Sequence, residues 1–175
     1  MPEIELEKSY LAKSLPPDLM TCPHKEIVDV YIPFESSHPV TRIRKKGEFY
    51  EITKKQPVKE DDWSEQTEYT IKLTKEEFEA LPQVRGKRVV KDRYDYPHLG
   101  QKAEIDIFKE DLKGLVLVDF EFVDRASMEA FVIPDFCLVE VTQEKIFAGG
   151  MLCGKSYVEI EGRLNELGYR AIITE

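Results

Sequence analysis

Acidic and apolar residues alternate in the first predicted strand, which covers residues 3–11. Side chains of a β-strand point alternately to its two faces, so Glu3, Glu5 and Glu7 share one face. Three neighbouring carboxylates repel one another, and such a face needs water, cations or a metal ion. By itself this strand favours a solvated sheet edge, but charge patterns further along the chain favour a different interpretation.

Four later segments carry charges of one sign on a single strand face. These residues are Arg42 and Arg44, then Lys87, Lys91 and Arg93, then Glu104 and Asp106, and finally Asp119 and Glu121. The last pair is the most informative, because the apolar residues between and beside its members form a continuous opposite face that must meet the core. Asp119 and Glu121 therefore point away from the core, although their strand is too hydrophobic for a typical sheet edge.

A barrel with a hydrated, charged interior explains five such strands better than a solvent-facing surface does. Its acidic strands would hold divalent cations, because hard cations prefer carboxylate oxygens. Its basic strands would hold a polyanion, because Arg and Lys suit phosphate oxygens. Acid and base in one cavity indicate a metal–polyphosphate complex as the ligand.

The elements that must position these residues are short strands with few helices before residue 124. We expect strands at 3–11, 27–32, 39–45, 48–55, 65–73, 86–95, 101–108 and 114–123. Residues 56–63 are predicted as a polar loop, and residues 124–131 and 142–152 as short helices. Capping boxes predict helices from Thr74 through Leu81, followed by Pro82, and from Ser156 to a stop at Gly168. The predicted fold is α+β, with one domain over residues 1–175 forming an eight-stranded antiparallel barrel with helices packed outside.

Composition narrows the choice of partners. The 175 residues carry a formal net charge of −9, which argues against binding to a nucleic-acid duplex. Three widely spaced cysteines and the lack of an apolar run long enough to span a membrane predict a cytoplasmic protein with reduced thiols. We expect a small-molecule partner, no membrane association, and a monomer or homodimer.

The charged strands, taken in order, resemble the CYTH superfamily of triphosphate tunnel metalloenzymes. The matching segments are Glu5-Leu-Glu7, Arg42-Ile-Arg44, Thr53-Lys-Lys55, Glu68, Lys91-Asp-Arg93, Glu104-Ile-Asp106, Asp119-Phe-Glu121 and Glu140-Val-Thr142. Each short pattern is weak alone, but their collinear order covers nearly the whole chain. The resemblance implies an antiparallel tunnel that binds a triphosphate together with Mg²⁺ or Mn²⁺.

The resemblance also implies roles for individual residues. Phosphate would be bound by Arg42, Arg44, Lys55, Lys91 and Arg93, with Lys54 as a rival to Lys55 and Lys87 as an additional cation. Metal would be bound by Glu5, Glu7, Glu68, Asp119 and Glu121, of which Glu7 and Glu121 are the expected catalytic residues. The implied activity is metal-dependent hydrolysis of inorganic triphosphate or of a small organic triphosphate.

The chain departs from the family pattern in its first strand. The family has a lysine at the position of Ser9, and the adjacent Lys8 would point to the other face. Losing this lysine removes one positive charge from the expected site, which bears on the reaction more than on the fold. Two alternatives therefore stay open: a non-catalytic module that binds polyphosphate or nucleotide, and a class IV adenylate cyclase.

Overall fold

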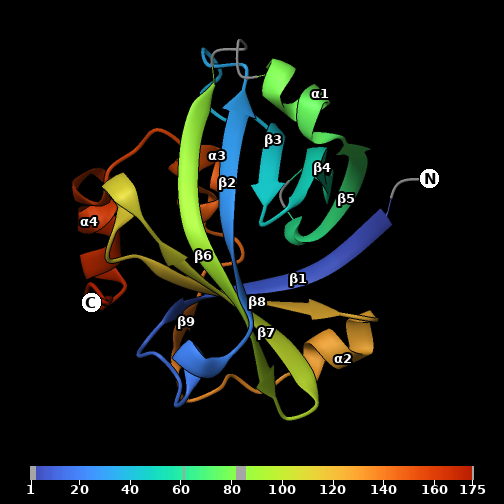
Figure 1. Cartoon of the computed structure of the whole chain (residues 1–175). Helices are drawn as coiled ribbons and strands as arrows, with labels where there is room; N and C mark the ends of the chain where they lie inside the picture. The colour runs from blue at the N-terminus through green and yellow to red at the C-terminus, as the bar shows by residue number, and fades with distance from the viewer. Residues whose placement is uncertain (1–2, 61, 82–85, 175) are drawn as a thin grey trace.

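The computed structural model describes residues 3–60, 62–81 and 86–174, and its nine strands form one antiparallel sheet. Eight of them close into a barrel in the order β1-β5-β4-β3-β2-β6-β7-β8, as Figure 1 shows. The strands are β1 (Glu3–Ala12), β2 (His24–Ile32), β3 (Thr41–Lys46), β4 (Phe49–Lys59), β5 (Asp62–Leu73), β6 (Lys87–His98), β7 (Gln101–Phe108), β8 (Val116–Phe122) and β9 (Cys137–Glu140). The predicted eight-stranded barrel is confirmed.

Strand β1 closes the barrel by pairing with different partners along its length. Its first half pairs with β5, ending at Leu6 opposite Glu65. From Leu6 to Leu11 its other edge pairs with β8. The ninth strand, β9, joins β1 only from Tyr10 onward and lies outside the ring.

Short helices connect and cover the strands. They are the α-helices α1 (Lys75–Ala80), α2 (Arg125–Glu129), α3 (Gly149–Leu152) and α4 (Tyr157–Glu166), together with single 3₁₀ turns at Leu19–Thr21, Glu110–Leu112 and Lys145–Phe147. Both predicted capping boxes are present, at Thr74 and at Ser156. Gly168 follows α4 with a φ of 75°, the left-handed conformation that suits glycine. Pro82 lies outside the described residues.

One of the two apolar clusters lies outside the barrel. The outer faces of β6, β7, β8 and β1 pack against α2, the 3₁₀ turn at Leu19 and the segment before β9. Val118 and Phe120 of β8 are fully buried on this outer face, as the sequence predicted. The inner face is therefore left to the charged residues that alternate with them.

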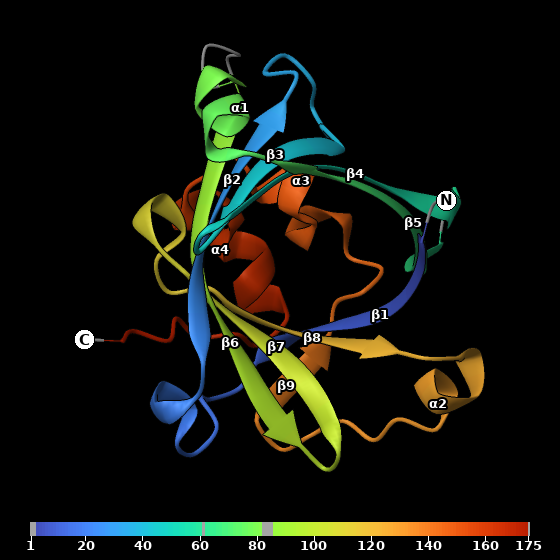
Figure 2. The ribbon, with the colours of Figure 1, turned by 45° about the vertical axis from the view of Figure 1, so that its right-hand side comes forward.

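A second apolar cluster closes one end of the barrel. Inward-facing Tyr31, Val89, Phe108 and Leu117 pack in one cluster with residues of α3 and α4. Figure 2 shows these two helices across the barrel opening. Thus α3 lies against the interior, whereas the sequence placed all helices outside.

The glycine pair at the start of α3 allows this close approach. A Cβ atom on Gly149 would overlap the Tyr31 hydroxyl, and one on Gly150 would overlap the backbone carbonyl of Pro39.

Two local predictions were wrong, and one strand was not predicted. Residues 56–63 are not a loop, because β4 continues to Lys59 and β5 begins at Asp62; residue 61 is not described. Residues 142–152 form a 3₁₀ turn and the short α3 rather than one helix. Strand β9 was missed, because it is only four residues long and only Cys137 of the four is buried.

All three cysteines are free; Cys137 and Cys153 are buried and Cys22 is half-buried. Among the helices of the described residues, none combines the length and apolarity that crossing a bilayer requires.

Tyr169 provides a test of how the end of the chain is anchored. Its hydroxyl accepts the Val116 N–H at 2.8 Å and donates to the Gly114 carbonyl at 2.8 Å. Tyr169→Phe leaves both backbone groups without this partner, and we expect the free energy of unfolding to fall by about 1–3 kcal/mol. Chemical denaturation measures the loss. Tyr69→Phe, at a half-exposed site, is the control; equal stability of both variants would contradict the anchoring role.

Candidate functional site

A cavity of about 350 Å³ lies inside the barrel and is lined mainly by charged side chains. Its walls carry ten carboxylates and seven cationic side chains. Most residues predicted for the site line it: Glu5, Glu7, Arg42, Arg44, Lys55, Glu68, Lys91, Arg93, Asp119 and Glu121. The side chain of Glu3 lies outside the described part of the chain. The cavity is thus an ionic interior rather than an apolar pocket.

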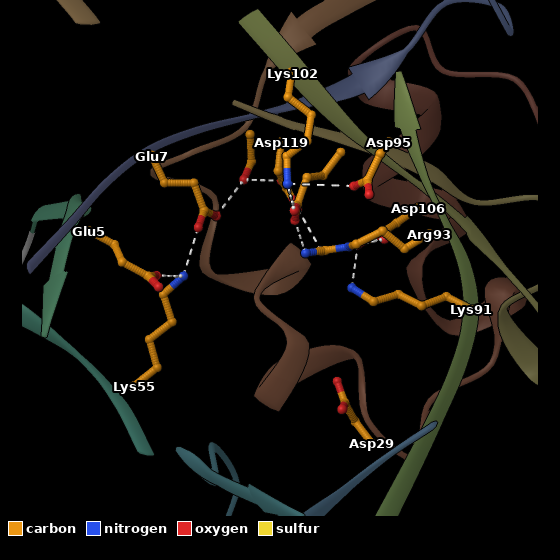
Figure 3. Close-up of polar contacts among 12 residues, drawn as sticks. Glu5, Glu7, Asp29, Lys55, Lys91, Arg93, Asp95, Lys102, Asp106 and Asp119 are labelled. Carbon is orange, nitrogen blue, oxygen red and sulfur yellow. Dashed lines mark hydrogen bonds and ion pairs between the residues drawn. The ribbon is translucent and has the colours of Figure 1, made fainter. Parts of the chain in front are cut away.

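Lys55 of β4 is held between two carboxylates of β1. Its Nζ lies 2.7 Å from Glu5 Oε2 and 2.7 Å from Glu7 Oε2 (Figure 3). Burial disfavours the charged form of Lys55, but Glu7 and Glu5 outweigh it and raise the pKa of the ammonium. Burial likewise opposes ionisation of Glu7, yet Lys55 keeps its pKa below the ordinary value. The pair therefore stays ionised near neutral pH.

A second ionic group is centred on Arg93 and Asp106. Arg93 donates Nε and Nη2 hydrogen bonds to the two oxygens of Asp106, at 2.6 Å each, and also contacts Glu104. Lys91 donates to the same Asp106 (Figure 3). Burial opposes ionisation of Asp106, but Arg93 and Lys91 lower its pKa to about 2. Burial lowers the pKa of Lys91 despite this contact.

A third group lies on β2 and β3. Arg44 forms a two-pronged pair with Asp29, with Nε–Oδ1 at 2.7 Å and Nη2–Oδ2 at 2.8 Å, and both side chains are buried. Arg42 contacts the Tyr31 hydroxyl at 3.3 Å and lies 3.6 Å from Glu68 Oε2. The Nε atom of Arg42 is buried, and within the described chain it has no hydrogen-bond partner. A buried donor of this kind is expected to meet a ligand or water.

Asp119 differs from the buried aspartates Asp29 and Asp106 because burial and neighbouring negative charge outweigh its cationic neighbours. Its Oδ1 accepts a hydrogen bond from Ser9 at 2.6 Å, and its Oδ2 lies 3.3 Å from Arg93. Burial, with the charges of Glu7 and Asp106, nevertheless raises the pKa of Asp119 to about 7. Burial with neighbouring carboxylates also raises the pKa of Glu121. This side of the cavity holds excess negative charge.

Three basic residues considered in the sequence are not brought to the cavity. Lys54 is exposed on the outer face of β4, so Lys55 is the inward residue of the two. Lys87 donates to the Ser36 carbonyl at 2.8 Å, away from the cavity lining. Lys8 lies 3.9 Å from Glu140 and does not line the cavity, consistent with the opposite face expected for it.

Other cavity residues were not singled out for the site. Asp29 was overlooked because it is a lone carboxylate in an apolar strand; its isolation between Val28 and Val30 was a signal of a buried, paired charge. Lys145, over the Trp63 ring, and Glu144 reach the cavity from the segment before α3. Arg163 of α4 holds Glu144 through two hydrogen bonds, at 2.6 and 3.1 Å. The sequence of the segment before α3 contains no charge pattern that would have predicted its position at the cavity.

The donor set suits a hard divalent cation. The carboxylates of β1, β5 and β8 supply oxygen atoms alone, the ligands that Mg²⁺ and Mn²⁺ prefer. In the described residues these groups are not gathered into a cluster of three ready to enclose a metal ion, and several are paired with Lys55 or Arg93. The excess negative charge around Asp119 is what a bound cation would relieve.

Comparisons with known proteins agree with this geometry. No family model matches the chain. The inorganic triphosphatase of Nitrosomonas europaea is 31% identical over 145 residues, covering 81% of this chain and 91% of the relative. A solved structure of an inorganic triphosphatase superposes with a TM-score of 0.63 at 28% identity, covering 86% of this chain and 95% of that one.

A more distant likeness concerns the fold alone. A Bacillus halodurans protein named as a candidate adenylate cyclase superposes with a TM-score of 0.54 at 14% identity, covering 99% of this chain and 95% of that one. The closed barrel, its charged interior and the curated relative lead to one conclusion: the chain belongs to the CYTH family of triphosphate tunnel proteins.

Proposed function

We propose that the protein hydrolyses inorganic triphosphate, or a small organic triphosphate, inside the barrel with the help of Mg²⁺ or Mn²⁺. The observation that carries this proposal is the convergence of cations and carboxylates from opposite walls on one cavity of about 350 Å³. Membership in a family whose 31% identical relative is an inorganic triphosphatase supports the same reaction. A cytoplasmic location and a monomeric or homodimeric state stay predictions.

The phosphate oxygens would be bound by Arg42, Arg44, Lys55, Lys91 and Arg93. Arg42 is the strongest candidate among these for binding phosphate. Its buried Nε has no hydrogen-bond acceptor within the described residues and could donate to a phosphate oxygen. Arg44 is held rigidly by Asp29, so its guanidinium presents a fixed charge at little further cost in side-chain entropy. Lys55, Lys91 and Arg93 form ion pairs with carboxylates of the cavity. On binding, each would replace part of its contact with a carboxylate by a contact with a phosphate oxygen.

The cation would be held by Glu5, Glu7, Glu68, Asp119 and Glu121. Glu7 and Glu121 are register partners across β1 and β8, and we propose them as the catalytic pair of this set. With ten carboxylates against seven cations, the cavity alone would repel a highly charged anion. A bound divalent cation neutralises phosphate charge and lowers the pKa of water. The protein residues orient the triphosphate and, through the apolar floor of α3 and α4, limit access from one end.

One alternative keeps a specific observation in its favour. Ser9 lines the cavity where the family has lysine, so the site has one positive charge fewer than the family pattern. A non-catalytic triphosphate-binding module would show tight binding by calorimetry without phosphate release. The class IV cyclase alternative rests on the likeness of fold alone, and cyclic AMP formation from ATP would support it.

Glu121→Gln tests the carboxylate set. The amide keeps the size of the side chain but loses its charge, so phosphate release from tripolyphosphate should fall by about 100-fold or more. A colorimetric phosphate assay measures the rate. Glu110→Gln, at the exposed pair with Arg88, is the matched control and should leave the rate unchanged. Unchanged turnover in Glu121→Gln would contradict the proposed role.

Removal of divalent ions tests the cofactor. We expect excess EDTA to abolish phosphate release, because the cavity's negative excess then opposes triphosphate binding. Adding back Mg²⁺ or Mn²⁺ should restore the rate, and a parallel series with the two ions ranks them. Full activity in excess chelator would overturn the metal requirement without excluding hydrolysis.

Arg42→Lys tests the anion side. Lysine keeps the charge but has no Nε donor and no planar fork, so the KM for tripolyphosphate should rise about 10-fold while kcat changes less. Steady-state kinetics separate the two constants. Arg88→Lys on the outer surface is the control. A variant with wild-type KM would show that Arg42 does not bind the substrate.

A further inference from the structure

Ser9 lies where the barrel wall changes partners. Strand β5 pairs with β1 only as far as Leu6, and β9 joins only from Tyr10. Between them the backbone of Ser9 is held by the segment after β9: its N–H donates to Thr142 Oγ1 at 3.1 Å, and its carbonyl accepts the Val141 N–H at 2.8 Å. With β8 paired on the other edge, the backbone of Ser9 is fixed from both sides.

The side chain of Ser9 lies between two carboxylates inside the cavity. Its Oγ is 2.6 Å from Asp119 Oδ1 and 3.3 Å from Glu7 Oε1. A hydroxyl has one proton and can donate to only one of them, which the shorter distance assigns to Asp119. The contact therefore holds two acidic groups near each other without neutralising either. Such an arrangement favours a cation between or beside them.

The nearby basic groups do not supply that cation in full. Lys55 contacts Glu7 but divides its charge with Glu5. Arg93 contacts Asp119 at 3.3 Å but makes its closer bonds with Asp106. Ser9 is small and neutral, so it leaves both space and uncompensated charge on this side of the cavity.

We propose that Ser9 is a positioning residue for the divalent cation: its hydroxyl fixes Asp119 beside Glu7 so that their oxygens present a joint binding surface. This inference rests on the proposed function, which includes a bound divalent cation. It assigns a role to Ser9, the residue that stands where the family has lysine. Removing the hydroxyl frees the Asp119 carboxylate to turn toward Arg93, which weakens the cation site. Outer hydrogen-bond partners of metal ligands typically contribute 10–100-fold to metal affinity.

The test measures Mn²⁺ binding directly, without substrate, by electron paramagnetic resonance of the free ion. Ser9→Ala should weaken Mn²⁺ affinity about 10–100-fold, while Ser9→Thr, which keeps the hydroxyl, should stay within about threefold of wild type. Ser64→Ala is the matched control, because Ser64 Oγ also donates to a carboxylate, Asp62 at 2.6 Å, but does not line the cavity. It should bind Mn²⁺ as wild type does.

Each other result overturns the inference. Wild-type affinity in Ser9→Ala, equal weakness of the alanine and threonine variants, or no Mn²⁺ binding by the wild type would each do so. Thermal unfolding verifies that the variants fold; if Ser9→Ala does not, Ser9→Val, which is β-branched like threonine but has no hydroxyl, replaces it under the same expectation. Phosphate release is measured separately. Ser9-dependent Mn²⁺ binding without hydrolysis would overturn the triphosphatase proposal alone, and hydrolysis with Ser9-independent binding would overturn this inference alone.

Discussion

Mutual compensation of buried charge is the constraint on which this structure depends. The barrel turns its charged face inward and its apolar face toward an outer layer, so ten carboxylates and seven cations share one cavity. Isolated charges could not persist there, because removing an ion from water costs several kcal/mol unless a partner and further hydrogen bonds offset it. Asp29 with Arg44 and Asp106 with Arg93 meet that condition through paired hydrogen bonds. The interior is thus a preorganised network of ion pairs that suits an ionic ligand.

The same network explains why the cavity is polarised. Cations of β3 and β6 are held by buried aspartates of β2 and β7, whereas the carboxylates of β1 and β8 share too little positive charge. Anion and cation sites therefore occupy different walls of one space. The apolar cluster in which Leu117 and Phe108 pack with α3 and α4 lowers the local dielectric at that end of the barrel and so strengthens these electrostatic interactions.

Most of the barrel and of the charged lining followed from alternation along single strands. Asp119 and Glu121 were assignable because Phe120 and its apolar neighbours determine which face meets the core. Pairing partners of individual charges were not assignable, since they depend on barrel register. The four-residue β9 and the cavity segment near Lys145 were also not predicted. Their positions depend on tertiary contacts and not on a local sequence pattern. Likewise, the strand through residues 56–59 looked like a loop, since Pro57 and polar residues conceal its pairing with β5.

The way β1 closes the ring has a consequence for how the chain assembles. Residues of β1 join partners more than fifty positions away in β5 and more than one hundred away in β8. Contacts of such sequence separation form late and slowly, because a long loop must be ordered before they stabilise anything. A nascent chain therefore exposes the edge and the acidic residues of β1 until most of the protein has been synthesised. Its alternating carboxylates would keep that waiting strand from pairing with copies of itself.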